Sequence, residues 1–373
     1  MKICINALPL LPPRTGVGRY TYHLINTIRT LYPTNDYYYF YHGKISTKLP
    51  EEDPLFPFLN KLKTLLKRTP FIHLFRPLLL RSLSSPEDVF DVYLEPNFIP
   101  LPGIKAKLII AVVHDFSFHL YPEWHPEDRV SFFSKHFWRE IKRADFIVCV
   151  SKTIREEAVS LGLPREKLRW IYPGIDHAIF HRLPETFLRD LRKMLSLPPH
   201  FLLYVGTLEP RKNLKFLLET YATFPLSFRR TYPLFLIGPK GWKLSSFSHL
   251  FSTEGVKVLG YVEDTLLAVY YNLATLLIYP SLYEGFGFPP LEAMACGCPA
   301  LVSDIPVFRE VYEDSAIYFD LSSSASLKEK IQMLVEDQES RVNYRQRALA
   351  HVKKFFWETT AQKLAELFNA PPA

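Results

Sequence analysis

The feature of this sequence that most constrains the fold is an alternation of apolar runs with amphipathic stretches, which occurs twice along the chain. Strands that alternate with helices are typical of parallel α/β sheets. The first series of expected strands lies at residues 1–8, 36–42, 91–95, 107–113, 145–150 and 167–172. The second series lies at residues 201–205, 234–237, 256–259, 276–279 and 299–303. Between them, the polar and proline-containing residues 177–199 suit a linker, so the sequence predicts an α/β protein with two domains.

The composition is that of a folded protein with a basic surface. Hydrophobic residues make up 48% of the 373 residues, which is enough material for two cores. The net charge of +7 permits contact with nucleic acid, anionic lipid or phosphorylated ligands, and charge alone does not choose among them. A nucleic-acid-binding protein would need cationic and aromatic residues on one face. No such face is visible in the sequence, so nucleic acid is not an expected partner.

The cysteines give no sign of a metal site or of a disulfide framework. Cys4 and Cys149 lie in expected buried strands, and the pair Cys296 and Cys298 has no second ligand pair or nearby histidines. This usage suits a reducing compartment. No stretch reaches the roughly 18 apolar residues that a membrane span requires. We therefore expect a cytoplasmic protein.

One stretch of the second half combines a strand, a glycine turn and a helix. Residues 276–279 form an apolar run typical of a buried strand, and residues 290–296 are helical in character and end at Gly297. Between them, Gly285 and Gly287 predict a tight turn. Free N–H groups at a helix start, beside glycines that let a ligand approach, form an anion pocket.

Two glutamates, Glu284 and Glu292, flank this expected pocket. A chain this acidic contains about one pair at such a spacing by chance, so the surrounding turn and helix give the pair its meaning. Both carboxylates are placed to accept hydrogen bonds from hydroxyl groups. The implied ligand carries both phosphate and sugar.

Glycine or polar residues also follow expected strands of the first half. Gly16 opens a helix after the first strand, which is a phosphate-binding arrangement. Thr21 stands where a dinucleotide fingerprint has its third glycine, so a plain loop is the alternative. His114 follows the strand at residues 107–113, at the edge where α/β sheets bind ligands, and an ordinary strand-end histidine is the alternative.

Residues 61–83 mix leucine and phenylalanine with lysine and arginine and contain no acidic residue. A basic amphipathic segment of this kind can lie on an anionic membrane leaflet, which would make the protein peripheral on the inner face of the cytoplasmic membrane. The alternative is a helix pair that packs its apolar face on the domain core. The sequence leaves both open.

Several blocks, in order along the chain, resemble the retaining glycosyltransferases of the GT-B fold, family 4. In the second half they are Gly206-Thr-Leu-Glu-Pro-Arg-Lys-Asn, Gly260-Tyr-Val and Glu284-Gly-Phe-Gly-Phe-Pro-Pro-Leu-Glu-Ala-Met-Ala-Cys-Gly-Cys-Pro299. In the first half they are Gly16-Val-Gly-Arg-Tyr, Val113-His-Asp, Ala144-Asp-Phe-Ile-Val-Cys-Val-Ser and Pro173-Gly-Ile-Asp. The resemblance covers nearly the whole chain.

This resemblance implies two Rossmann-like domains that face across a cleft. The acceptor-binding domain would comprise residues 1–180 plus a C-terminal helix, about residues 352–373, that crosses back to it. The nucleotide-sugar-binding domain would comprise residues 195–351. The family pattern also implies a role for each matched residue.

Carried over to the second half, Glu292 would bind the ribose hydroxyls and Glu284 would contact the donor sugar. The backbone N–H groups around Phe286 and Gly287 would face the sugar and the diphosphate. Lys212 would neutralise the diphosphate, although a solvated lysine at a helix start is the alternative.

In the first half, the backbone at Gly16 would approach the same phosphates, and His114 would lie near the sugar and the reaction centre. Many family members have an arginine directly after the glycine that corresponds to Gly206, and here Thr207 stands in its place. Arg211 is the candidate replacement.

The residue types also predict how the leaving diphosphate is stabilised. A leaving diphosphate needs a metal ion or fixed cations and dipoles. The sequence contains no Asp-x-Asp motif, so Arg211, Lys212 and helix N-termini are expected to act instead. We expect transfer with retention and with no metal or other cofactor.

Residues 95–100 and 114–118 are similar to those of mannosyltransferases that build surface polysaccharides, which implies a saccharide or lipid-linked acceptor. GDP-mannose is the first expectation for the donor and a UDP-sugar the second. A nucleotide-sugar epimerase or a phosphorolytic enzyme of the same fold is the main alternative, and a basic nucleic-acid-binding protein is a weaker one.

Overall fold

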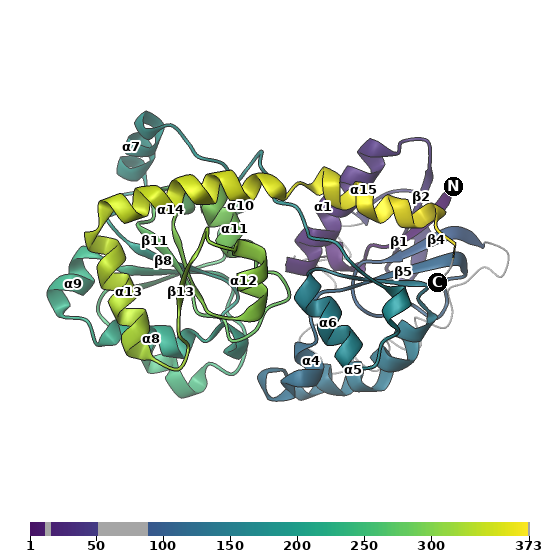
Figure 1. Ribbon diagram of the computed structural model, residues 1–373, viewed down its shortest axis with the longest axis horizontal. Coiled ribbons are helices and arrows are strands. Elements are labelled where there is room, and N and C mark those ends of the chain that lie inside the picture. Colours follow the sequence, from purple (N-terminus) through teal and green to yellow (C-terminus); the bar gives the residue numbers. More distant parts are fainter. Residues whose placement is uncertain (12–15, 51–88, 372–373) are drawn as a thin grey trace. The chain divides into compact units, whose positions relative to one another are not determined.

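The computed structural model describes residues 1–11, 16–50 and 89–371. These residues form two compact units, each built around a twisted sheet with helices on both faces (Figure 1). Unit 1 comprises Met1–His119, Glu127–Gly174 and Trp357–Ala373, and unit 2 comprises Leu120–Pro126 and Ile175–Phe356. The expectation of two Rossmann-like α/β domains is confirmed.

The sheet of unit 1 has the strand order β3-β2-β1-β4-β5-β6-β7. Its strands are β1 Lys2–Asn6, β2 Asp36–Tyr41, β3 Lys44–Ser46, β4 Phe90–Glu95, β5 Ala106–Val113, β6 Phe146–Cys149 and β7 Leu168–Trp170. All neighbours are parallel except β2 and β3, which form a hairpin at the edge. The carboxyl ends of the parallel strands therefore meet at one edge, where the residues after β1, β4 and β5 lie close together.

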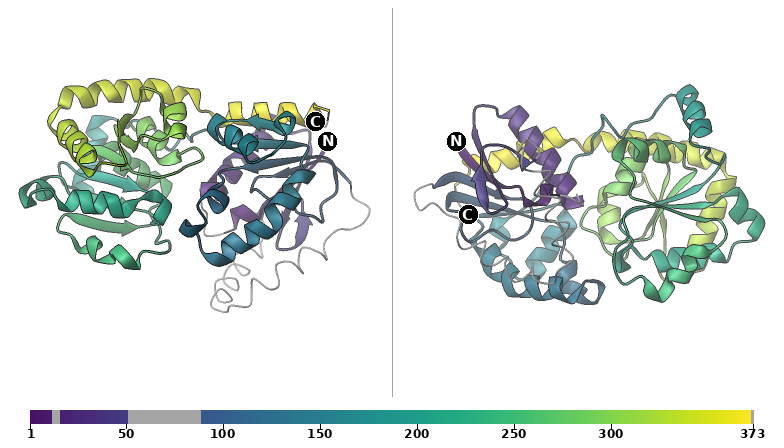
Figure 2. Two further views of the ribbon diagram at one scale, coloured as in Figure 1. Left: turned by 60° about the horizontal axis from the view of Figure 1, so that its bottom comes forward. Right: turned by 180° about the vertical axis from the view of Figure 1, so that it is seen from behind.

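The helices of unit 1 cover this sheet. They are α1 Gly16–Leu31, α4 Ser117–Leu120, α5 Glu127–Glu140, α6 Lys152–Ser160 and α15 Trp357–Glu366. Ser151 caps α6, because its hydroxyl accepts a hydrogen bond from the Ile154 N–H at 3.2 Å. The C-terminal helix α15 packs on α1 (Figure 2). The ring of Trp357 at its start contacts Tyr20 and His23.

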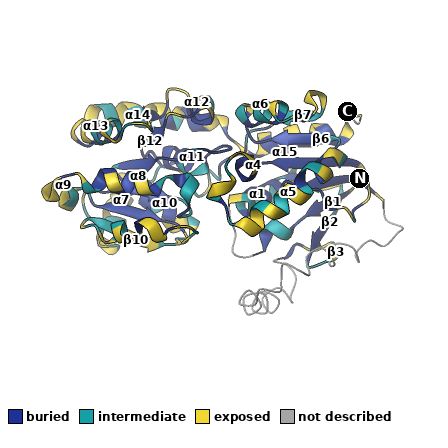
Figure 3. Ribbon diagram, turned by 90° about the horizontal axis from the view of Figure 1, so that it is seen from below, coloured by how far each residue is buried: buried dark blue, intermediate teal, exposed yellow. Residues whose placement is uncertain are grey.

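The sheet of unit 2 is parallel throughout, with the order β10-β9-β8-β11-β12-β13. Its strands are β8 Leu202–Val205, β9 Leu234–Ile237, β10 Val256–Gly260, β11 Leu276–Tyr279, β12 Ala300–Ser303 and β13 Ile317–Phe319. Every residue of β8, β9, β11 and β12 is buried, as strands covered on both faces must be (Figure 3). The edge strand β10 is largely exposed.

The helices of unit 2 lie along both faces of its sheet. They are α7 Glu185–Met194, α8 Leu214–Ala222, α9 Leu226–Thr231, α10 Asp264–Leu273, α11 Phe288–Ala295, α12 Pro306–Tyr312, α13 Ser324–Glu336 and α14 Gln338–His351. Leucine, isoleucine and aromatic side chains from α8 and α13 meet those of β8, β9 and β11 in one apolar core. This core fixes the strand ends from which the loops of the candidate site emerge.

Three expectations about elements were wrong. The stretch at residues 177–199 contains helix α7, which buries only Leu188 and is otherwise polar enough to read as linker. Residues 299–303 are not the last strand, because the three-residue strand β13 follows. The sequence of residues 340 to about 368 also predicts one long helix, but the structure interrupts it between α14 and α15, where the Phe355 carbonyl accepts from the Ile175 N–H at 3.1 Å.

Candidate functional site

The loop after β11 places Glu284 inside unit 2. Strand β11 ends at Tyr279, and the chain then turns through Ser281 before α11 begins. The Leu282 N–H donates to the Arg211 carbonyl at 2.9 Å, which ties this loop to the loop after β8. Parallel neighbours β8 and β11 bring both loops to the same edge of the sheet. Residues far apart in sequence therefore meet around one carboxylate.

Glu284 is buried and accepts hydrogen bonds from four side chains. Its Oε1 accepts from the Lys212 ammonium, from the Tyr279 hydroxyl at 2.9 Å and from the Ser281 hydroxyl at 2.8 Å. Its Oε2 accepts from Arg211 Nη1 at 2.6 Å. Lys212 Nζ also donates to the Tyr279 hydroxyl at 2.6 Å. Two cations and two hydroxyls therefore hold the carboxylate in a single orientation.

The electrostatics of this cluster favour the ionised carboxylate. Burial by itself raises the pKa of Glu284, but the neighbouring Arg211 and Lys212 cations outweigh it and lower the pKa to about 2. Burial lowers the pKa of Lys212, and the charge of Glu284 opposes that shift. Lys212 is only 8% exposed, so it is not the solvated helix-start lysine that the sequence left as an alternative.

Arg211 links Glu284 to a second buried carboxylate. Its Nε and Nη2 donate to Glu209 Oε1 at 3.2 and 2.9 Å, and its Nη1 donates to the Tyr283 carbonyl at 3.1 Å. Arg211 therefore reaches the cluster from a position four residues after Thr207. With Glu209, Arg211, Lys212 and Glu284 all ionised, the formal charges of the four side chains cancel.

Gly287 caps the start of α11 in a conformation that only glycine tolerates there. Its φ is +94°, and a Cβ atom would lie 2.1 Å from the Tyr312 hydroxyl and 2.9 Å from Phe308 Cε1. The same hydroxyl donates to the Gly287 carbonyl at 2.7 Å. The turn between β11 and α11 is thus locked against α12.

The start of α11 carries fewer amide donors than an ordinary helix. Its first residues are Phe288, Pro289 and Pro290, and the two prolines have no N–H group. The amides near the turn are those of Phe286, Gly287 and Phe288. An anion at this helix start would meet this short run of donors and not the usual set of the first turn.

Glu292 lies one turn into α11 and is also buried. Its Oε2 accepts a hydrogen bond from the Tyr271 hydroxyl of α10 at 3.1 Å. At the other end of α11, Gly297 has a φ of +75°, and the Cys298 N–H donates to the Ala293 carbonyl at 2.8 Å. This C-terminal cap ends the helix where the sequence predicted.

The remaining predicted residues belong to unit 1. His114 follows β5, and its Nε2 lies 2.8 Å from the Pro96 carbonyl oxygen. Burial lowers the pKa of His114, which favours the neutral imidazole. Gly16 is the first residue of α1, and within the described residues a Cβ atom there would meet nothing within 4 Å. Gly16 is therefore not required by packing against those residues.

Four polar residues of the cluster in unit 2 carried no sequence signal. Tyr279 and Ser281 bind Glu284, Tyr271 binds Glu292, and Tyr312 binds the carbonyl of Gly287. Tyr279 stands at the end of an apolar run, which predicts a strand and no further role. Tyr271 and Tyr312 reach the site from α10 and α12, which no local pattern links to α11.

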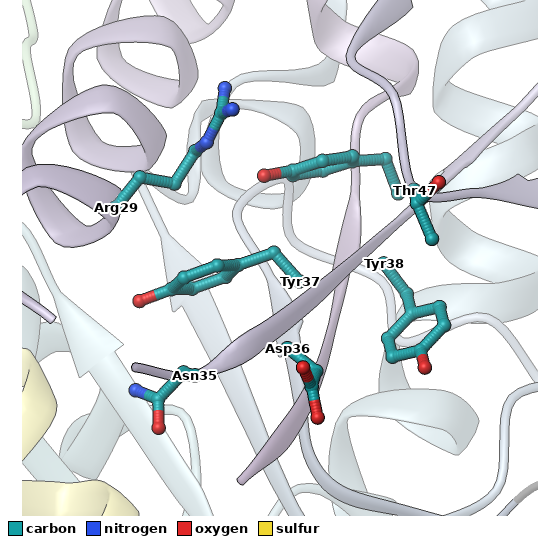
Figure 4. A pocket seen from close by; sticks show the side chains of 7 residues that line it. Arg29, Asn35, Asp36, Tyr37, Tyr38 and Thr47 are labelled. Carbon is teal, nitrogen blue, oxygen red and sulfur yellow. The ribbon is translucent and has the colours of Figure 1, made fainter. Parts of the chain in front are cut away.

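A pocket of about 270 Å³ lies elsewhere in unit 1, and no predicted site residue lines it (Figure 4). Its lining residues are Arg29, Asn35, Asp36, Tyr37, Tyr38, Tyr39 and Thr47. Asp36 is the first residue of β2, so the pocket lies at the edge of the sheet opposite to His114. Nothing in the position of this pocket connects it with the predicted transfer of a sugar.

The remaining expectations concern a membrane-binding segment, a membrane span and a metal site. The basic segment at residues 61–83 lies outside the described residues. Within the described ranges, no helix is both long and apolar enough to span a bilayer. In the same ranges, no three His, Cys, Asp or Glu side chains are grouped so that they could hold a metal ion.

Two family models match the chain, one in each half. The model described as Glycosyltransferase Family 4 matches residues 14–179, and the model described as Glycosyl transferases group 1 matches residues 191–351. Among solved structures, WaaG, a glycosyltransferase involved in lipopolysaccharide biosynthesis, aligns over the whole of both chains with a TM-score of 0.69 and 16% identity. The Anabaena protein Alr3699/HepE, in complex with UDP and glucose, aligns over 98% of this chain and 99% of its own with a TM-score of 0.68 and 18% identity. These likenesses establish the fold.

Curated relatives show to which family the chain belongs. O-antigen chain mannosyltransferase B of Escherichia coli is 32% identical over 372 residues, which cover 96% of this chain and 97% of that protein. O-antigen chain mannosyltransferase RfbU of Salmonella typhimurium is 28% identical over 65% of each chain. The serotype-specific mannosyltransferase WbdA of Escherichia coli is 29% identical over 62% of this chain, which spans only 29% of that protein. The chain therefore belongs to glycosyltransferase family 4 and is a glycosyltransferase of the GT-B fold.

Proposed function

We propose that this glycosyltransferase transfers mannose from GDP-mannose to a saccharide or lipid-linked acceptor in the synthesis of a surface polysaccharide. The observation that carries the proposal is the buried cluster in unit 2, where Arg211 and Lys212 converge on Glu284 beside the start of α11. Fixed cations beside backbone amides suit a nucleotide diphosphate. The neighbouring carboxylates suit the hydroxyls of sugars.

In this proposal the diphosphate of the bound donor takes over part of the contacts that Arg211 and Lys212 make with Glu284. Lys212 and Arg211 both contact Glu284, so an incoming diphosphate competes with a carboxylate that already holds the two cations in place. Because these cations are oriented before the donor arrives, little reorganisation is required at the moment of reaction. Transfer is then expected to need no metal ion.

Glu292 and the turn at Gly287 complete the proposed donor site. Glu292 is proposed to bind the ribose hydroxyls, sharing its carboxylate with the Tyr271 hydroxyl. The amides of Phe286 and Gly287 are proposed to face the sugar and the diphosphate. From unit 1, the backbone at Gly16 is proposed to approach the phosphates, and His114 is proposed to lie near the reacting sugar.

The names of the relatives support mannose as the sugar. O-antigen chain mannosyltransferase B and the mannosyltransferases RfbU and WbdA all carry this activity in their names. A UDP-sugar is the second candidate, since Alr3699/HepE was solved with UDP and glucose. Retention of the anomeric configuration and peripheral contact with a membrane remain parts of the proposal.

Binding and product analysis test this function. In a thermal-shift series with GDP, UDP and ADP and their sugars, GDP-mannose is expected to raise the melting temperature most, because a ligand that binds only the native state stabilises it. Transfer is expected to continue in EDTA and to give a product with retained configuration. A protein that no nucleotide stabilises, or whose activity a chelator abolishes, would contradict the corresponding part.

A further inference from the structure

A buried carboxyl group at the ligand-binding edge of unit 1 is held by two neighbouring strands. Glu95 is the last residue of β4 and is fully buried. Its Oε1 and Oε2 accept from Asn6 Nδ2 at 2.9 and 2.8 Å, and Oε2 accepts from the Tyr93 hydroxyl at 2.6 Å. Asn6 ends β1, which pairs with β4. These donors fix the carboxyl group in one orientation.

The turn after Glu95 is fixed at both ends. Glu95 Oε1 accepts from the Asn97 N–H at 3.0 Å, and the Phe98 N–H donates to the Val112 carbonyl of β5 at 2.9 Å. Phe98 has a φ of 67°, a left-handed conformation that a bulky residue adopts only when its surroundings determine it. The buried Phe98 ring provides such surroundings by packing on Phe118 and Phe133.

This turn presents a carbonyl oxygen to His114. The Pro96 carbonyl can only accept, so its 2.8 Å contact with Nε2 requires the proton on that nitrogen. Tyr20 and Phe98 pack edge-on against the imidazole, with ring centroids 4.9 and 5.4 Å away. Because the ring is neutral, Nδ1 keeps its lone pair. None of the described residues forms a hydrogen bond with Nδ1.

We propose that Glu95 is a positioning residue that, through the Pro96 carbonyl, keeps His114 in the Nε2-protonated tautomer, so that Nδ1 accepts a hydrogen bond from a sugar hydroxyl. This inference rests on the proposed function, in which His114 serves the reacting sugar. A lone pair at Nδ1 suits a hydroxyl, which has a proton to donate. It does not suit a phosphate oxygen, which offers only lone pairs.

The tautomer can be read from the imidazole ¹⁵N chemical shifts of the full chain labelled with ¹⁵N-histidine. The signal of His114 is assigned by its loss in His114→Asn. In the unaltered protein we expect a protonated Nε2 and an unprotonated Nδ1. Glu95→Gln turns one acceptor oxygen into an N–H donor, so at least one contact of Glu95 is lost and the turn shifts.

For Glu95→Gln we expect a mixture of His114 tautomers and a kcat about 10-fold lower, with the donor KM changed less than about twofold. The matched control is Asp145→Asn, which loses a carboxylate that accepts from the Ile109 N–H at 2.8 Å at the opposite edge of the same sheet. This control should leave the tautomer unchanged. Tyr93→Phe is a smaller change, because it removes only the hydroxyl that donates to Glu95 Oε2 at 2.6 Å. It takes the place of Glu95→Gln if that variant does not fold.

An unchanged His114 tautomer in both Glu95→Gln and Tyr93→Phe would overturn the proposal, even if activity fell. Replacing the histidine tests the Nδ1 role, because the asparagine Oδ1 lies near the place of Nδ1 and the glutamine amide near that of Nε2. His114→Asn should keep about 10-fold more of the kcat than His114→Gln, and the reverse order would exclude Nδ1 as the acceptor. An unaltered protein that transfers no sugar would instead refute the proposed function, and the tautomer measurement would still stand.

Discussion

Arg211 Nη1 donates to Glu284 Oε2 over 2.6 Å, although the same guanidinium also binds Glu209. Arg211 is thereby shared between two buried carboxylates, whereas Lys212 has Glu284 as its only ion-pair partner among the described residues. The two cations therefore depend on Glu284 to different degrees. Glu284 orients both, and Glu209 orients only one.

This difference makes Glu284→Ala the more damaging of two matched substitutions. Removing the carboxylate leaves Lys212 buried without its partner, and breaking a buried ion pair in this way costs about 3–5 kcal/mol. We expect turnover to fall about 100-fold, as when one preorganised transition-state contact is lost. Stopped assays of kcat, with urea unfolding as the measure of stability, check both effects.

Glu209→Ala is the control, because it removes a neighbouring carboxylate of Arg211 and leaves the pair of Lys212 and Glu284 in place. Its turnover should fall less than that of Glu284→Ala. Equal losses in the two variants would show that Arg211, and not Lys212, carries the dependence on Glu284.

Glu292 is expected to act on donor binding more than on turnover. Glu292→Ala removes the acceptor proposed for the ribose hydroxyls, and the lost hydrogen bonds to a charged group should weaken donor binding by about 1.5–3 kcal/mol. Isothermal titration with the nucleotide alone measures this directly. Tyr271→Phe removes one donor to the same carboxylate and should leave Glu292 available to the ribose, so its effect on affinity should be smaller. A large fall in kcat with unchanged affinity would mean that the roles of Glu284 and Glu292 are exchanged.

The sequence was sufficient for the parts of the site that depend on local chemistry. Glycines beside a strand and a helix start indicated the turn at Gly287, with Glu284 and Glu292 on either side of it, and the family pattern added Lys212. Elements with strong apolar runs were predicted to within a few residues. In these cases the signal lies in neighbouring residues, so a single sequence contains it.

The parts that were missed depend on contacts between distant elements. Tyr312 reaches Gly287 from α12, and nothing near Gly287 in the sequence marks that contact. The break between α14 and α15 follows from the bond of Phe355 with Ile175, since the residues themselves suit a continuous helix. Helix α7 has too few apolar residues to stand out from a linker. Tertiary packing decided the first two, and the polar composition of α7 the third.

Glu95 should make stability depend on pH in the opposite sense to Glu284. Burial raises the pKa of Glu95 to about 8, despite hydrogen bonds that lower it. Its folded-state pKa lies above the unfolded value of roughly 4.3, so its favourable contribution is complete below pH 4 and is lost as the pH rises to about 8. The loss is on the order of 5 kcal/mol. Glu284 contributes above that unfolded value, and its contribution is lost as the pH falls toward 2.

Urea unfolding of Glu95→Gln and of the unaltered protein between pH 5 and 9 isolates this contribution. The difference in unfolding free energy between the two proteins should shift in favour of the variant as the pH rises. A difference that stays constant across this range would contradict the raised pKa of Glu95. Glu284→Gln provides the comparison, because its difference from the unaltered protein should change only below about pH 5.

Gly287→Ala tests whether the turn before α11 is set by backbone conformation or by the contact with Tyr312. The left-handed backbone alone costs about 1 kcal/mol for alanine. Gly260→Ala measures that term separately, because Gly260 has a φ of +73° and a Cβ atom there would meet nothing within 4 Å of the described residues. Gly287→Ala should cost more than this control, since its Cβ would lie 2.1 Å from the Tyr312 hydroxyl.

The double variant Gly287→Ala with Tyr312→Phe separates the two causes. Removing the hydroxyl takes away the closest clash, so the cost of Gly287→Ala should be lower in the Tyr312→Phe background than in the unaltered protein. The contact with Phe308 at 2.9 Å persists, so the rescue should be partial. If the two costs were equal, the left-handed backbone at Gly287 would be the reason for glycine there. Donor affinity measured on the same four proteins would then show whether the position of the turn, and not its stability alone, governs nucleotide binding.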